Sequence, residues 1–113
     1  MTATHLMVEG VLGTPHTERE LVDFIRKVAS SDPGINMKII MGPMICAAAD
    51  HRVAYAIIAE SHIIINEFDD RRFTMDVFSC KSFERTIPVD LAMKILDLQP
   101  GYIMRILFRA GVE

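Results

Sequence analysis

The sequence predicts an α+β fold, a two-layer α/β sandwich in which two helices lie on one face of a mainly antiparallel sheet. Two observations support this prediction. Apolar residues repeat with a period of two in several short segments and with the helical period of 3.6 in two longer ones, and turn residues separate these segments. We write the predicted order as β-α-β-β-β-α-β. The second sheet face then needs a cover, and we expect the sheet faces of two copies to pair in a dimer.

The chain is expected to begin with a strand and a helix. Residues 5–12, HLMVEGVL, have the composition of a strand that ends at glycine and proline. Thr17 and Glu20 have the spacing of a capping box. The amphipathic helix that follows is predicted to end near residues 30–34, SSDPG, and its apolar stripe comprises Leu21, Phe24, Ile25 and Val28.

The middle of the chain is expected to form strands. The predicted segments are residues 36–41 (NMKIIM), 52–60 (RVAYAIIAE), 62–68 (HIIINEF) and 72–80 (RFTMDVFSC). Residues 42–51, GPMICAAADH, are predicted to be a loop, and residues 69–72, DDRR, a tight turn that joins the last two strands in a hairpin. In residues 72–80 the side chains of Phe73, Met75 and Val77 should lie on one face, and those of Asp76, Phe78 and Cys80 on the other.

The chain is expected to close with a second helix and a final strand. Pro88 stands where a helix would begin, because proline is tolerated in the first turn. Val89, Ala92, Met93 and Leu96 then repeat at helical spacing. Residues 102–109, YIMRILFR, alternate apolar residues with arginine and predict the last strand.

Length and composition indicate one domain that spans residues 1–113. The net charge is −3 and neither sign is gathered into a block, so we expect no nucleic-acid partner and no membrane. Half of the residues are hydrophobic, which favours an apolar surface buried in an oligomer. Cys46 and Cys80 are too few for a disulfide framework or a zinc site, which indicates a reduced, cytoplasmic protein.

Residues 59–65, AESHIII, interrupt an apolar run with Glu60, Ser61 and His62. Such polar residues at a strand junction often bond only to the local backbone. A Ser-His-Asp hydrolase is a second interpretation, but the sequence has no G-x-S-x-G segment. The third is self-cleavage: the serine hydroxyl attacks the preceding carbonyl, forms an ester and eliminates, leaving a pyruvoyl ketone that can form a Schiff base.

The segment AIIAESHIIINEF, followed by MDVFSC, resembles the prokaryotic-type S-adenosylmethionine decarboxylases, and the similarity extends over nearly the whole chain. That family carries an Ala/Ser-Glu-Ser-His phrase at the end of an apolar strand and an Asp-(Val/Leu)-Phe-(Thr/Ser)-Cys phrase at the end of the next strand but one. The combination at this spacing is specific, whereas either phrase alone would be weak.

The resemblance implies a proenzyme that cleaves itself between Glu60 and Ser61. The products would be a β chain of residues 1–60 and an α chain of residues 61–113 whose first residue is a pyruvoyl group made from Ser61. This covalent group would be the cofactor, and no metal or diffusible cofactor is implied. The substrate would be the small molecule S-adenosylmethionine, in polyamine (spermidine) biosynthesis. Cys80 occupies the position of the family's proton donor.

The resemblance also places a substrate-binding turn after the strand at 62–68. In the family an acidic residue of this turn contacts the ribose hydroxyls. Here the corresponding segment contains Phe68, Asp69 and Asp70, and either aspartate could serve, because the hairpin is one residue shorter. Asp69 and Asp70 could equally do no more than form the turn.

Two positions depart from the family in residues that assist processing. Asn66 stands where the family has a histidine, and Val53 stands where it has a serine; neither can transfer a proton near neutral pH. His51 and His62 are the nearest histidines, and we expect His62 to point away from the face that carries Asn66. Residues 42–52 also lack the aromatic residue that stacks on adenine in the family.

Three hypotheses follow. The chain is a self-processing S-adenosylmethionine decarboxylase, a pyruvoyl decarboxylase of the same fold with a changed substrate, or an uncleaved, non-catalytic relative that acts as a binder or regulatory partner. Glu60, Ser61, His62 and Cys80 favour the first. The missing aromatic favours the second, and Asn66 with Val53 favours the third.

Overall fold

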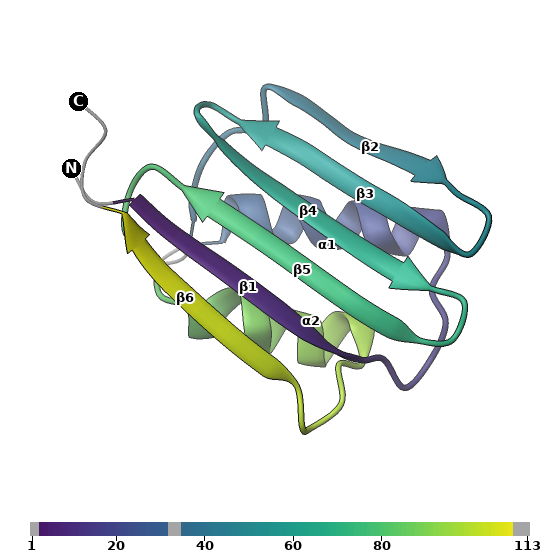
Figure 1. Ribbon diagram of the computed structural model, residues 1–113. Helices are drawn as coiled ribbons and strands as arrows, with labels where there is room; N and C mark the ends of the chain where they lie inside the picture. Colours follow the sequence, from purple (N-terminus) through teal and green to yellow (C-terminus); the bar gives the residue numbers. More distant parts are fainter. Residues whose placement is uncertain (1–2, 32–34, 110–113) are drawn as a thin grey trace.

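The structure is a computed structural model that describes residues 3–31 and 35–109. These residues form one six-stranded sheet and two helices (Figure 1). The elements are β1 (Ala3–Val11), α1 (Glu18–Ser30), β2 (Met41–Ala47), β3 (His51–Ile58), β4 (Ser61–Phe68), β5 (Arg72–Ser79), α2 (Thr86–Leu96) and β6 (Ile103–Arg109).

The strand order in the sheet is β2-β3-β4-β5-β1-β6, and all neighbours are antiparallel. Both helices lie on the same face of the sheet (Figure 1). The predicted α+β sandwich is therefore confirmed. The written order β-α-β-β-β-α-β was one strand short: four strands lie between the helices, in agreement with the four strand segments predicted there. The first and last strands of the chain lie side by side because β1 inserts between β5 and β6.

The core lies between the sheet and the helices. Along β3, β4 and β5 the side chains alternate between buried and half-buried, as expected for strands with one covered face. Phe73, Met75 and Val77 share one face of β5, as predicted, and this face points into the core, whereas Asp76 and Phe78 lie on the opposite face. The same alternation continues in β1, where Leu6 and Val8 are fully buried.

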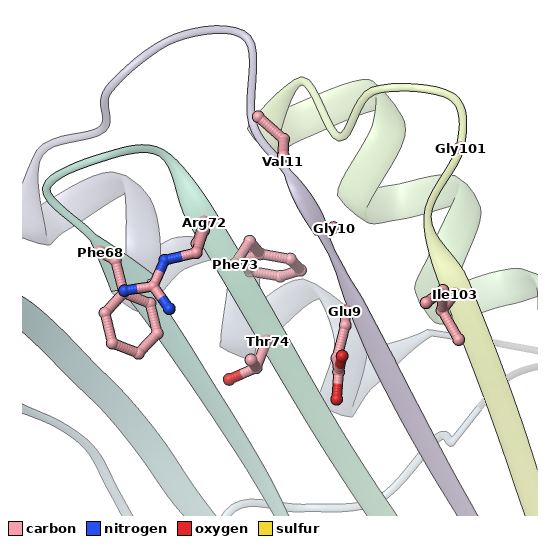
Figure 2. A pocket seen from close by; sticks show the side chains of 9 residues that line it. All are labelled: Glu9, Gly10, Val11, Phe68, Arg72, Phe73, Thr74, Gly101 and Ile103. Atoms are coloured by element: carbon pink, nitrogen blue, oxygen red, sulfur yellow. The ribbon is translucent and has the colours of Figure 1, made fainter.

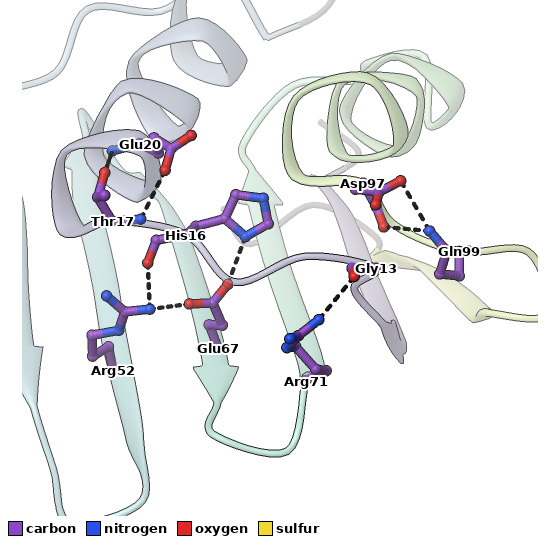
Figure 3. A network of polar contacts seen from close by, with 9 residues as sticks. All are labelled: Gly13, His16, Thr17, Glu20, Arg52, Glu67, Arg71, Asp97 and Gln99. Carbon is purple, nitrogen blue, oxygen red and sulfur yellow. Dashed lines mark hydrogen bonds and ion pairs between the residues drawn. The ribbon is translucent and has the colours of Figure 1, made fainter.

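Helix α1 begins as predicted, at a capping box. The Thr17 side chain accepts a hydrogen bond from the backbone N–H of Glu20, and the Glu20 carboxylate accepts one from the backbone N–H of Thr17 (Figure 3). The bond from the Thr17 backbone holds the pKa of Glu20 below its ordinary value, because it stabilises the charged carboxylate. The predicted apolar stripe is buried against the sheet: Leu21, Phe24, Ile25 and Val28.

Helix α2 contains Pro88 in its first turn, as expected, and buries Val89, Ala92 and Leu96. Met93 was predicted to belong to the same stripe, but its exposed fraction is 41%. Pro88 is also buried, so the buried stripe of this short helix is centred away from Met93, which lies at its edge.

The prediction for β2 was wrong. Residues 36–40 form no strand, and β2 occupies Met41–Ala47, so all but its first residue lie in the predicted loop. Gly42 and Pro43 suggested a loop, but they form an irregularity in the pairing with β3 between Met41 and Met44. Such a bulge and a proline are tolerated here because β2 is an edge strand, which needs partners on one side only.

The sheet face opposite the helices, here called the open face, carries many apolar side chains. Its cross-strand pairs include Met44 with Tyr55 and Leu107 with His5. Five large hydrophobic residues of this face have exposed fractions of 49% to 57%: Val11, Met41, Met44, Ile103 and Leu107. The predicted dimer would cover them, and it stays a prediction. Among the described residues, no helix is long and apolar enough to cross a membrane.

Candidate functional site

Ser61 is the first residue of β4, directly after a tight turn. Ile58 pairs with Ser61, so Ala59 and Glu60 are the two turn residues. Ala59 has a φ of 54°, in the left-handed region that a residue with a Cβ adopts at a cost. The two turn residues are exposed, whereas Ser61 is buried and on the helix side of the sheet. The peptide bond of interest therefore joins an exposed residue to a buried one.

Cys80 is brought next to Ser61 by the hairpin of β4 and β5, as predicted. The backbone N–H of Cys80 donates a hydrogen bond of 2.9 Å to Ser61 Oγ. Among the described residues, no carboxylate or imidazole is hydrogen-bonded to Ser61 Oγ. The contact therefore orients the hydroxyl oxygen but supplies no base that would remove its proton.

Val53 and Asn66 are direct cross-strand partners in β3 and β4. Both lie on the open face, where the Asn66 side-chain amide donates a 3.1 Å hydrogen bond to Thr74 Oγ1. The two departures from the family pattern are thus side by side. The prediction that His62 points away from this face was wrong: His62 and Asn66 are four residues apart in a regular strand, so the period of two places them on the same face.

Asp69 and Asp70 occupy the turn between β4 and β5, at the opposite end of β4 from Ser61. This strand is eight residues long, so its two ends are roughly 23 Å apart at the usual rise. Asp70 accepts hydrogen bonds from the backbone N–H and the Nε of Arg72, at 3.1 and 2.8 Å. The backbone bond and the guanidinium hold the pKa of Asp70 below its ordinary value. One chain does not bring these aspartates next to Ser61.

A hollow of about 440 Å³ lies at this far end of the open face. Figure 2 shows Arg72 beside the ring of Phe68, and Glu9 and Thr74 further along the hollow. The Arg72 guanidinium carbon is 4.5 Å from the centroid of the Phe68 ring, a cation–π contact. His51 stacks on the same ring at 4.8 Å. The predicted substrate-binding residue Phe68 therefore belongs to an aromatic and charged pocket distant from Ser61.

A second hollow of about 270 Å³ adjoins the first, since both are lined by Glu9 and Thr74. Asn66 and Asp76 line the second hollow, so the concave surface extends toward the end of the sheet that carries Ser61. The open face is thus hollowed along β5 and β1.

A cluster that sequence analysis did not identify lies at that end. His5 Nε2 is 2.5 Å from Asp76 Oδ1, and His62 Nε2 is 3.4 Å from the same oxygen. The two histidine rings meet edge to face at 6.3 Å between centroids. Alternation along a single strand could not predict this cluster. The cluster depends on the strand order, in which β5 lies between β1 and β4.

A buried polar network lies at the other end, on the helix side of the sheet. His16 Nδ1 is 2.7 Å from Glu67 Oε2, and Arg52 contacts both the Glu67 carboxylate and the backbone oxygen of His16 (Figure 3). His16 and Glu67 side chains are each 3% exposed. This network ties the segment before α1 to β3 and β4, and buried charges are retained only when paired in this way.

No protein-family model and no curated protein matches the sequence. The structure, however, is similar to the crystal structure of the adenosylmethionine decarboxylase from Aquifex aeolicus, with a TM-score of 0.75 and 15% sequence identity. The match covers 98% of this chain and 92% of that one. At this identity the likeness establishes the fold, which extends over nearly the whole of both chains.

Proposed function

We propose that the protein is a pyruvoyl-dependent S-adenosylmethionine decarboxylase-like enzyme that cleaves itself between Glu60 and Ser61. The observation that carries the proposal is the position of Ser61: buried, oriented by the Cys80 N–H, and directly after a turn with a left-handed alanine. Full-length similarity of the fold to an adenosylmethionine decarboxylase supports it. The reaction would be a decarboxylation in polyamine biosynthesis, in the cytoplasm, and the cleaved chains would be residues 1–60 and 61–113.

The chemistry proceeds from the Ser61 hydroxyl. Oγ attacks the Glu60 carbonyl carbon, the peptide C–N bond breaks, and an ester replaces it. Elimination then releases the Glu60 carboxylate and leaves residue 61 as dehydroalanine, which rearranges to an imine. Water hydrolyses this imine, ammonia leaves, and residue 61 becomes the pyruvoyl group. Once formed from Ser61, the ketone would supply the electron sink that decarboxylation of a substrate amine needs. Burial of Ser61 would hold the reacting carbon away from water, and Cys80 is the proposed proton donor to the product.

A second copy completes the proposed substrate site. Ser61 and the acidic turn of Asp69 and Asp70 lie at opposite ends of β4, too far apart for one small molecule. Two open faces packed in an antiparallel arrangement would bring the turn and the Phe68 pocket of one copy toward the Ser61 end of the other. Ser61 lies on the helix side before cleavage, so the proposal requires that its position change when the bond between Glu60 and Ser61 breaks. We therefore propose a homodimer in which each substrate contacts both chains.

A specific observation also favours an uncleaved, non-catalytic form. Asn66 and Val53, at the two processing positions, are paired across β3 and β4, and the Asn66 amide is already bonded to Thr74. This pair supplies no group that could remove or donate a proton in the elimination step. The second candidate function is therefore a small-molecule binder or regulatory partner with the same fold.

Intact mass measured under denaturing conditions distinguishes the two candidates. After purification and incubation we expect two chains, residues 1–60 and 61–113, the second blocked to N-terminal sequencing. Ser61→Ala should give only the full-length mass, because the attacking hydroxyl is gone. The matched control is Ser79→Ala, since Ser79 is also a buried serine, on the neighbouring strand β5, and this variant should still be cleaved.

Two outcomes would overturn the proposal. Cleavage of Ser61→Ala would show that the cut lies elsewhere, and a persistent full-length mass in the natural chain would leave the binder or regulatory function. In that second case, Asn66→His would restore cleavage if the lost acid–base group alone blocks it.

A further inference from the structure

Three neighbouring strands bring two histidines and an aspartate to one point on the open face. His5 in β1 and His62 in β4 are both cross-strand partners of Phe78 in β5, so the three side chains form a row across the sheet. Asp76 lies two residues from Phe78 on the same face of β5, between the two histidines. Side chains on adjacent strands of a sheet are held more rigidly than side chains on loops.

The ligand atoms of these three residues converge. One nitrogen of each imidazole and one carboxylate oxygen all lie within 4.8 Å of one another. Asp76 Oδ1 is the only polar partner of either imidazole among the described residues, and the buried Nδ1 of His5 has no partner there. An ion placed between the three atoms would therefore displace only these two contacts to Asp76.

We infer that His5, His62 and Asp76 form a binding site for a divalent transition-metal ion of the zinc class. Two imidazole nitrogens and one carboxylate are a ligand set that such ions prefer, and they leave further coordination positions open to water or another ligand. In a single chain the His5 side chain is 16% exposed, whereas His62 and Asp76 are 38% and 41% exposed, so an ion can enter from the open face before the proposed dimer covers it.

The surroundings fit a metal site as well. The Phe78 ring packs against both imidazoles, with centroid distances of 5.7 Å to each. It limits the orientations of both rings, and an apolar neighbour strengthens coordination by keeping water from one side. This site was not predictable from the sequence, because His5 and Asp76 are 71 residues apart and their contact depends on the strand order of the sheet.

Binding of Co²⁺ to the untagged full-length protein tests the inference. We expect one ion per chain by calorimetry and visible absorption bands of coordinated Co²⁺ without a thiolate charge-transfer band, displaced by added Zn²⁺. His62→Gln and Asp76→Asn each remove one ligand and keep a polar side chain of similar size. Each should weaken binding by about tenfold or more.

His51→Gln is the matched control, because His51 is a histidine of the neighbouring strand β3 with its own carboxylate partner, Asp50. It should bind Co²⁺ with unchanged affinity, and circular dichroism checks that all three variants fold. Equal affinity in His62→Gln and His51→Gln, or no binding of one ion per folded chain, would overturn the inference. The test reads binding alone, so its result is separate from cleavage and decarboxylation.

Discussion

At the scale of single residues, the peptide bond between Glu60 and Ser61 joins a strained turn to a buried strand. Ala59 occupies the left-handed region with a φ of 54°, where glycine is the favoured residue of a two-residue hairpin turn. Alanine there costs roughly 1 to 2 kcal/mol. Pairing of β3 with β4 on one side and burial of Ser61 on the other hold the turn in this conformation. Strain held by the surrounding structure is typical of sites where a bond is rearranged.

The Cys80 thiol and the Cys80 backbone have separable roles in the proposed enzyme. Cys80→Ala removes the thiol but keeps the backbone N–H that donates to Ser61 Oγ. We therefore expect cleavage to proceed as in the natural chain, and the decarboxylation rate to fall by about 10²-fold or more, because the proton donor is lost. Intact mass measures the cleavage step, and release of carbon dioxide from S-adenosylmethionine measures decarboxylation. Both are measured on the same cleaved preparation.

The control for this prediction is Cys46→Ala, which removes the exposed cysteine of β2. It should retain both steps. Turnover that is the same in Cys80→Ala and Cys46→Ala would make Cys80 a structural residue and move the proton donor elsewhere.

At the scale of elements, β2 depends on a glycine. Gly42 has a φ of 98°, and a Cβ there would lie 2.9 Å from the backbone oxygen of Tyr55 and 3.0 Å from the backbone nitrogen of Met44. Gly101 has a similar φ of 92° but no atom within 4 Å of the same position. Both glycines allow a left-handed backbone, and only the first is also crowded by the neighbouring strand.

Gly42→Ala and Gly101→Ala therefore separate backbone strain from crowding. Both variants should lose about 1 to 2 kcal/mol in the free energy of unfolding from the left-handed backbone. Gly42→Ala should lose about 1 kcal/mol more, since the backbone of β2 must move away from β3. Urea unfolding measures the difference in the free energy of unfolding, provided that the two variants have the same dependence of this free energy on urea concentration. Equal losses in the two variants would mean that β2 shifts without cost.

The elements differ in how far their sequence determines them. The capping box of Thr17 and Glu20 is local, so the start of α1 was predictable, and alternation placed Phe73, Met75 and Val77 on one face. β2 was not predictable, because a Gly-Pro pair indicates a loop unless the strand lies at an edge. The contact of Cys80 with Ser61 followed from one hairpin. The convergence of His5 with Asp76 required the position of β1 in the sheet, which no local pattern contains.

At the scale of the whole molecule, the two sheet faces differ in how they are covered. One face is closed by α1 and α2, and the open face exposes large apolar side chains from both edges of the sheet. Met44 lies on β2 at one edge and Leu107 on β6 at the other. Apolar groups spread across a whole face favour a partner of matching shape, and a second copy offers one.

The double variant Met44→Glu, Leu107→Glu tests this dimer. Packing of two open faces would bury both side chains, and unpaired charges in an apolar interface are strongly unfavourable. We therefore expect the natural chain to sediment as a dimer and the double variant as a folded monomer. Phe108→Glu is the control: Phe108 is 64% exposed and adjacent to Leu107, but it points to the helix side of the sheet, so this variant should stay dimeric. A dimeric double variant would place the interface elsewhere, and the proposed substrate site shared by two chains would then lose its basis.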